Sequence, residues 1–110
     1  MLFENLSLSK SIQKAVFELG YIEATPIQEQ AIPIVLSGKD IIGCAQTGTG
    51  KTAAFAIPII HQLHRIVGSS KKAKQIRALV VTPTRELAVQ IGQSFDAYAK
   101  FTNITQLTIF

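Results

Sequence analysis

The sequence has little of what marks secreted, membrane-bound or disulfide-rich proteins. Its 110 residues include no tryptophan and one cysteine, Cys44. A single cysteine excludes an intrachain disulfide. No apolar run approaches the roughly 20 residues that a membrane-spanning helix requires. The first five residues have neither the basic start nor the apolar stretch of a signal peptide. These absences predict a cytoplasmic protein with reduced thiols and no membrane partner.

Acidic residues are also scarce relative to basic ones. Seven Asp and Glu residues stand against eleven Lys and Arg residues, which gives a formal charge of +4. This balance suits a polyanionic partner such as nucleic acid. Four of the basic residues lie between positions 71 and 77, either as a nucleic-acid contact or as a solvated loop. A hydrophobic content of 47% is enough for one small core and argues against disorder.

The most informative stretch is a glycine-containing loop between an apolar run and a helical pattern. The run that ends at Cys44 reads as a strand, with Cys44 as a small core residue, and a helix starts near Lys51. Strand, glycine loop and helix are the context of a phosphate-binding loop. Gly48 and Gly50 let backbone N–H groups converge on an anion, Lys51 would reach the β- and γ-phosphates, and Thr52 would hold Mg²⁺. The loop residues are Ala45, Gln46, Thr47, Gly48, Thr49, Gly50, Lys51 and Thr52.

The remaining pattern predicts an α/β fold. Helices are expected at about 9–19, from 25–26 onward, at 50–66 and at 85–100, and short apolar strands at 40–44, 78–81 and 104–110. Strands that alternate with helices indicate a parallel sheet with right-handed crossovers. Ligands in such sheets collect at the carboxyl ends of the strands, so the loops after Cys44 and Thr82 should share one rim. Pro33 is expected to kink or divide the second helix.

Gln28 has two interpretations that the residues alone leave open. Its amide could pair with both N7 and the N6 amine of adenine, a pattern that guanine does not offer. Thr25 and Gln28 also have the spacing of a capping box, in which the glutamine only bonds back to the cap. The aromatic residues Phe3 and Tyr21 could cover a base or could be ordinary core residues.

Two further sets of polar side chains are candidates for binding. Arg85 opens a helix at the predicted rim, where its side chain and the backbone N–H groups could hold a phosphate, or could instead pair with an acidic neighbour. His61 and His64 lie three residues apart on one helix, but no cysteine or carboxylate accompanies them. A histidine pair that binds no metal is therefore expected.

Three segments together resemble the motifs of DEAD-box RNA helicases. The segment 20–28 resembles the family's Q motif, and Phe3 lies seventeen residues before Gly20, where the family carries an isolated aromatic. The loop 45–52 is similar to motif I, A-x-x-G-x-G-K-T, which accounts for Ala45 in place of the more general glycine. Residues 83–88, P-T-R-E-L-A, match motif Ia. The sequence between the motifs looks closest to the bacterial RhlE-like subgroup.

The resemblance implies the N-terminal part of a RecA-like P-loop NTPase domain, a three-layer fold with a parallel sheet. It implies ATP and Mg²⁺ as cofactors and short RNA duplexes as substrates, separated with ATP hydrolysis. Gln28 would then read adenine. Pro83, Thr84 and Arg85 would contact the RNA backbone without reading bases.

Parts of the family's machinery do not occur in these residues. The sequence has no Asp-Glu-Ala-Asp, no Ser-Ala-Thr and no second RecA-like domain with its arginine finger. Residues 1–110 alone are therefore expected to bind nucleotide without hydrolysing it and to expose unpaired sheet edges. The competing hypotheses are a non-catalytic RNA-binding module and another P-loop NTPase, such as a small kinase.

Overall fold

The structure is a computed structural model, and it describes residues 1–46, 48, 50–67 and 75–110. Of the residues singled out above, Thr47, Thr49 and the lysines between 71 and 74 lie outside the described residues. None of the described helices is long and apolar enough to cross a membrane.

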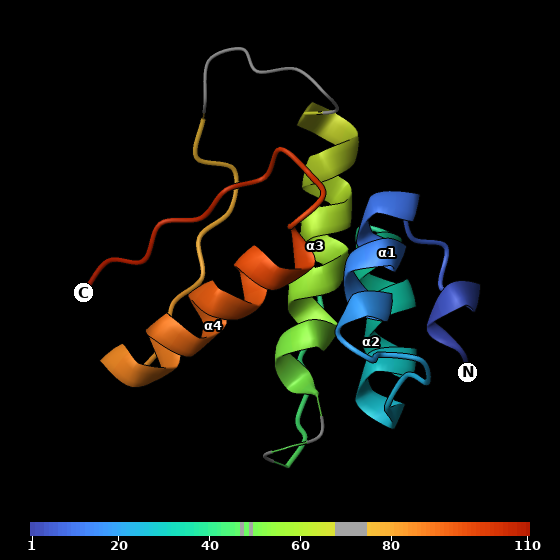
Figure 1. Ribbon diagram of the computed structural model, residues 1–110. Coiled ribbons are helices and arrows are strands. Elements are labelled where there is room, and N and C mark those ends of the chain that lie inside the picture. Colours follow the sequence, from blue (N-terminus) through green and yellow to red (C-terminus); the bar gives the residue numbers. More distant parts are fainter. Residues whose placement is uncertain (47, 49, 68–74) are drawn as a thin grey trace.

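Among the residues that the structure describes, the regular structure consists of four α-helices and one short 3₁₀ helix. They are η1 (Phe3–Asn5), α1 (Lys10–Glu18), α2 (Pro26–Leu36), α3 (Lys51–Val67) and α4 (Arg85–Tyr98). Figure 1 shows α3 at the centre, with α1 and α2 on one side and α4 on the other. The predicted helix positions are confirmed to within about two residues, and α2 continues through Pro33 without dividing.

The core forms around α3 because its first half is apolar nearly all round, which is typical of a buried helix. Ala56, Ile57 and Ile60 are completely buried. Ile12 and Val16 of α1, and Ile32 of α2, pack into the same cluster. Phe55 of α3 and Phe95 of α4 lie with ring centroids 6.3 Å apart. The helices therefore pack into one core through α3.

The predicted parallel sheet is not formed. The described residues contain no strand and only an isolated bridge between Leu2 and Glu23. The expected strand segments leave apolar side chains in solvent: Ile42 is 96% exposed, Leu79 84% and Leu107 83%. The predictions of strands at 40–44, 78–81 and 104–110 are therefore wrong for this structure. The reason is that β-propensity describes only how well a residue fits into a strand. A stable strand also needs the hydrogen bonds of a neighbouring strand, which here would have to come from a distant part of the sequence.

Cys44 is a second correction, because it is exposed rather than a core residue. It was expected inside a covered strand, and without the sheet nothing covers it.

The C-terminal segment instead runs along α4. The Gln106 amide donates to Asp96 at 3.1 Å, and the Arg85 guanidinium lies 4.9 Å from the Phe110 ring centroid. Between these contacts the segment passes close to Gly92, where an added Cβ would meet the Thr108 hydroxyl at 2.5 Å. Gly92 therefore permits the close approach of this segment to α4.

Candidate nucleotide-binding and RNA-binding site

The described residues of the loop before α3 have backbone features that suit an anion. Gly48 and Gly50 both adopt left-handed conformations, with φ of +84° and +83°. The first hydrogen bond of α3 runs from the Ala54 N–H to the Gly50 carbonyl, at 3.1 Å. The N–H groups of Lys51, Thr52 and Ala53 precede this first helical hydrogen bond, so they lie at the positive end of the helix dipole. Such an arrangement favours a phosphate.

The side chains at this end of α3 fit a nucleoside triphosphate with Mg²⁺. Lys51 is exposed on the first turn, where its ammonium group is available to an anion, and Thr52 is half-buried beside it. A hydroxyl in that position is a suitable oxygen ligand for Mg²⁺. The charge, the hydroxyl and the backbone donors are therefore together at one helix terminus.

Gln28 links this loop to the start of α2. Its carbonyl oxygen accepts from the Thr25 N–H at 2.9 Å, and its amide nitrogen donates to the Gly50 carbonyl at 3.3 Å. The side chain is only 3% exposed. A Cβ on Gly50 would collide with the Gln28 amide nitrogen. Position 50 therefore requires glycine for two reasons: its backbone is left-handed, and the Gln28 side chain occupies the space that a Cβ would take.

The capping interpretation of Gln28 thus matches a bond that is present. Thr25 is the N-cap of α2 and forms a capping box with Gln28. The reciprocal contact is weaker, because the Thr25 hydroxyl oxygen is buried without a full hydrogen bond among the described residues. A glutamine amide retains one further N–H and one further lone pair after these two bonds. Adenine recognition by Gln28 remains a prediction.

Phe3 and Tyr21 are part of a row of rings. Phe3 is buried in the core, and its ring centroid is 5.7 Å from that of Tyr21. The Phe3 N–H donates to the Ile22 carbonyl at 2.9 Å, so η1 holds the segment that leads toward Gln28. On its other side Tyr21 contacts Tyr98, the last residue of α4. A base-covering role for Phe3 or Tyr21 remains a prediction.

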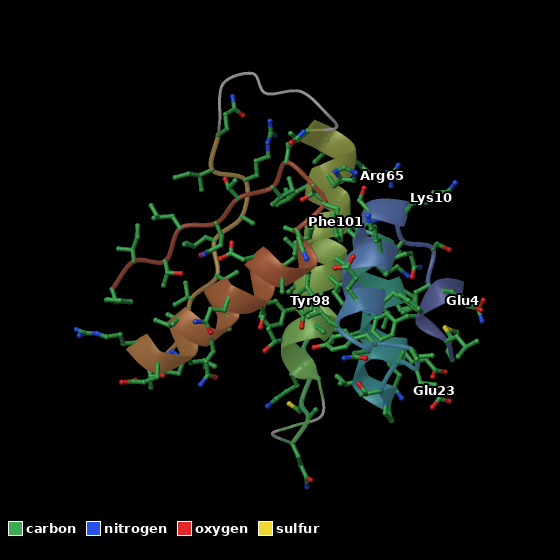
Figure 2. All side chains as sticks on the ribbon, in the orientation of Figure 1. Glu4, Lys10, Glu23, Arg65, Tyr98 and Phe101 are labelled. Carbon is green, nitrogen blue, oxygen red and sulfur yellow. The ribbon has the colours of Figure 1, made fainter. Side chains whose placement is uncertain are left out.

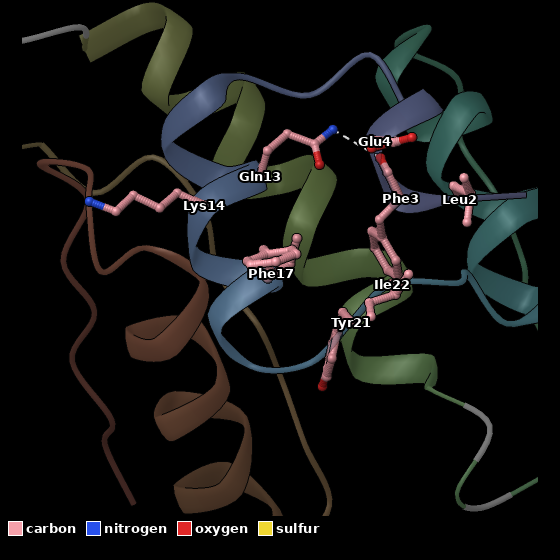
Figure 3. Close-up of a pocket in the computed structure, with 9 residues that line it drawn as sticks. Leu2, Phe3, Glu4, Gln13, Lys14, Phe17, Tyr21 and Ile22 are labelled. Atoms are coloured by element: carbon pink, nitrogen blue, oxygen red, sulfur yellow. Dashed lines mark hydrogen bonds between the residues drawn. The ribbon is translucent and has the colours of Figure 1, made fainter.

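A cavity of about 440 Å³ lies beside these rings, between η1 and α1 (Figure 3). Gln13 stands at its edge and donates to the carbonyls of Phe3 at 2.9 Å and Leu6 at 3.3 Å. The lining residues are Leu2, Phe3, Glu4, Gln13, Lys14, Val16, Phe17, Tyr21 and Ile22. Neither Gln28 nor any residue of the glycine loop is among them. This cavity is therefore separate from Gln28 and the glycine loop.

The second predicted site lies at the start of α4. Thr84 is the N-cap, and its hydroxyl oxygen accepts from the Leu87 N–H at 3.2 Å. Pro83, Thr84 and Arg85 are all exposed. The Arg85 guanidinium stacks over the Phe110 ring, a contact that neither interpretation of Arg85 had anticipated. The exposed start of α4 remains accessible to a phosphate.

The histidine pair makes a structural contact that the sequence did not indicate. The Ser9 N–H donates to Nδ1 of His61 at 3.1 Å, which links the N-cap of α1 to α3. Burial, and then the nearby Arg65 and His64, lower the pKa of His61. This contact joins residues 52 apart, so no local pattern could have predicted it.

Comparisons with known proteins show which family this chain resembles. The model of the DEAD/DEAH box helicase family matches residues 25–109. The DEAD-box ATP-dependent RNA helicase RhpA of Helicobacter pylori is 48% identical over 98% of this chain and 20% of its own length. The ATP-dependent RNA helicase CshA of Limosilactobacillus reuteri is 56% identical over 91% of this chain and 19% of its own length.

A solved structure shows the same spatial arrangement. The crystal structure of the RNA helicase Prp28 from Chaetomium thermophilum bound to ADP matches with a TM-score of 0.86 and 39% identity, over 99% of this chain and 26% of that one. The chain therefore spans about a fifth of the length of the curated relatives above.

Proposed function

This chain belongs to the DEAD/DEAH box helicase family, and from that premise we propose that it is the ATP-binding part of an ATP-dependent RNA helicase. The observation that carries the proposal is the glycine loop at the start of α3. Gly48 and Gly50 have left-handed backbones, and Lys51 follows Gly50 as the first residue of the helix. The ADP-bound state of a structure with the same arrangement supports it.

In this proposal each part of the site has a defined role toward the nucleotide. The loop 45–52 holds the phosphates through its backbone N–H groups, Lys51 neutralises their charge, and Thr52 supplies an oxygen to Mg²⁺. Mg·ATP supplies the γ-phosphate for transfer to water. Gln28, with Tyr21 and Phe3 behind it, selects adenine at the other end of the nucleotide.

The proposed RNA contact is made at the start of α4. Pro83, Thr84 and Arg85 bind backbone phosphates, so binding is tolerant of sequence and sensitive to salt. Hydrolysis and strand separation belong to a longer assembly with the second RecA-like domain, and the 110 residues by themselves bind nucleotide without turnover. The cytoplasmic location and the RhlE-like subgroup remain predictions; the relatives above carry other names, RhpA and CshA.

The test is a calorimetric titration of the chain with Mg·ADP and with Mg·GDP. Gln28→Glu is the informative variant, because glutamate keeps the oxygen that accepts from Thr25 but loses the amide donor that adenine N7 needs. Gln30→Glu is the matched control, since Gln30 is exposed on the same helix and the charge change is the same.

A preference for ADP that Gln28→Glu abolishes and Gln30→Glu retains would support adenine recognition. Equal affinity for both nucleotides would leave a phosphate loop without base selection. No binding of either nucleotide would overturn the proposal.

Lys51→Ala separates the proposed function from an RNA-binding module without nucleotide chemistry. In the proposal this variant loses nucleotide affinity and retains binding to RNA, measured by filter binding without nucleotide. If Lys51→Ala leaves nucleotide affinity unchanged, the loop is not the phosphate site.

A further inference from the structure

One hydrogen bond connects the two halves of the proposed site. The Tyr21 and Tyr98 hydroxyls lie 3.1 Å apart, and their ring centroids 5.9 Å, although the residues are 77 positions apart in sequence. Figure 2 shows Tyr98 where α4 meets the other helices. The bond therefore fixes the end of α4 against the segment between α1 and α2.

The environment of this pair makes the bond specific. Tyr98 is only 3% exposed. Burial, and then the hydrogen bond with Tyr21, raise the pKa of Tyr98, so its hydroxyl is neutral at physiological pH. The nearby Ser94 hydroxyl, one turn earlier in α4, acts on the pKa of Tyr98 in the opposite direction. Since a buried hydroxyl without a partner is costly, α4 is held in the register that keeps the pair together.

The two tyrosines belong to segments that carry different proposed binding sites. Tyr21 belongs to the segment that continues to Thr25 and Gln28, and the Gln28 amide bonds to Gly50 at the phosphate loop. Tyr98 ends the helix that begins with Arg85. Because an α-helix is rigid over 14 residues, a shift at Tyr98 moves the start of α4 with it.

The ring contact that joins α4 to α3 is of a different kind from this hydroxyl pair. The rings of Phe55 and Phe95 pack at 6.3 Å, and apolar contacts of this type have no single preferred register. The hydroxyl pair is directional, so it can transmit a small displacement where the ring contact would absorb it.

We propose that the Tyr21–Tyr98 hydroxyl pair couples nucleotide binding at the glycine loop to RNA binding at Arg85, with Tyr98 as the positioning residue. The inference rests on the function proposed above. Binding of one ligand changes the position of the tyrosine segment or of α4, and the pair passes that change to the other site. The coupling needs only the two hydroxyls, and Tyr21→Phe keeps the ring that the proposed function places behind Gln28.

The test measures the affinity for a non-hydrolysable Mg·ATP analogue with and without saturating poly-uridine RNA. Three variants remove hydroxyl groups without changing ring size: Tyr98→Phe, the double variant Tyr21→Phe/Tyr98→Phe, and Ser94→Ala as control. The double variant leaves no unpaired tyrosine hydroxyl, so it is expected to fold even where Tyr98→Phe is destabilised. Ser94→Ala removes a hydroxyl that also influences Tyr98, but one that lies within α4 itself.

In the parent chain RNA is expected to change the analogue's affinity by about fivefold or more, a usual size for coupling between sites. Tyr98→Phe and the double variant should bring that ratio close to one while each ligand alone still binds, and Ser94→Ala should keep the ratio. A purely structural role would weaken both affinities and leave their ratio unchanged, which would overturn the inference. So would a parent ratio of one with both ligands bound. Failure of the parent to bind either ligand would instead overturn the proposed function, and the coupling with it.

Discussion

Replacing Gly50 with alanine should destabilise this chain more than the same change at Gly48. Both glycines have nearly the same left-handed backbone, with φ of +83° and +84°. They differ in their surroundings, because a Cβ at position 50 would collide with the Gln28 amide, while a Cβ at position 48 would meet nothing within 4 Å. The pair therefore separates backbone strain from side-chain collision.

The magnitudes follow from these two contributions. An L-residue in the left-handed region costs about 1–2 kcal/mol, and this applies to both variants. At position 50 the Gln28 side chain must also move, which breaks its bonds to Thr25 and to Gly50. At about 0.5–1.5 kcal/mol for each bond, the added cost is about 1–3 kcal/mol. Gly50→Ala should thus exceed Gly48→Ala by that amount.

The assay is urea unfolding followed by circular dichroism at the helical band. A double-mutant cycle gives the decisive comparison, because in the Gln28→Ala background the collision is gone and Gly50→Ala should cost only the backbone strain. If Gly50→Ala and Gly48→Ala lower the unfolding free energy equally, or if the cycle shows no interaction with Gln28, the link between α2 and the glycine loop does not contribute to stability as described.

Three other predictions follow from contacts elsewhere in the chain. Burial lowers the pKa of His61 below 6.5, so the unfolded chain takes up a proton that the folded chain excludes, and the unfolding free energy should fall as the pH drops through 6.5. His61→Asn, which keeps a hydrogen-bond acceptor without titrating, should flatten that pH dependence. Gln13→Ala should lower the unfolding free energy by about 1–3 kcal/mol through the loss of two bonds, while the exposed Gln30→Ala changes it little. The exposed Leu79 and Leu107 should promote concentration-dependent association in sedimentation experiments, and Leu→Ser at both positions should reduce it.

The helices could be predicted because their signals are local. Thr25 and Pro26 mark the start of α2 as cap and first-turn residue, and Gly20, with φ of +84°, follows the end of α1. Each of these signals acts within one turn of the helix it defines. The loop glycines were predictable for the same reason, since their spacing to Lys51 lies within a few residues.

The sheet and the long-range contacts could not be predicted in the same way. Val80 and its apolar neighbours have the composition of a strand, but composition does not supply the second backbone that a strand must pair with. Likewise, Ser9 is hydrogen-bonded to His61 across 52 residues, and Tyr21 to Tyr98 across 77 residues. Nothing in the sequence connects the two members of either pair. The physical origin of both failures is that pairing depends on the packed fold.

The described residues form no paired sheet, which shows what holds Gly48 and Gly50 in their conformations. A parallel sheet was expected to aim the loop, yet here residues 40–44 are unpaired, and Gly48 and Gly50 still take their left-handed conformations. The loop is held from its other side, by α3 packed against α2 and by the bond from Gln28 to Gly50. Gln28 is therefore already bonded to the proposed phosphate loop through Gly50, without any contact with a base. A ligand that hydrogen-bonds to the Gln28 amide would therefore contact the same side chain that bonds to Gly50.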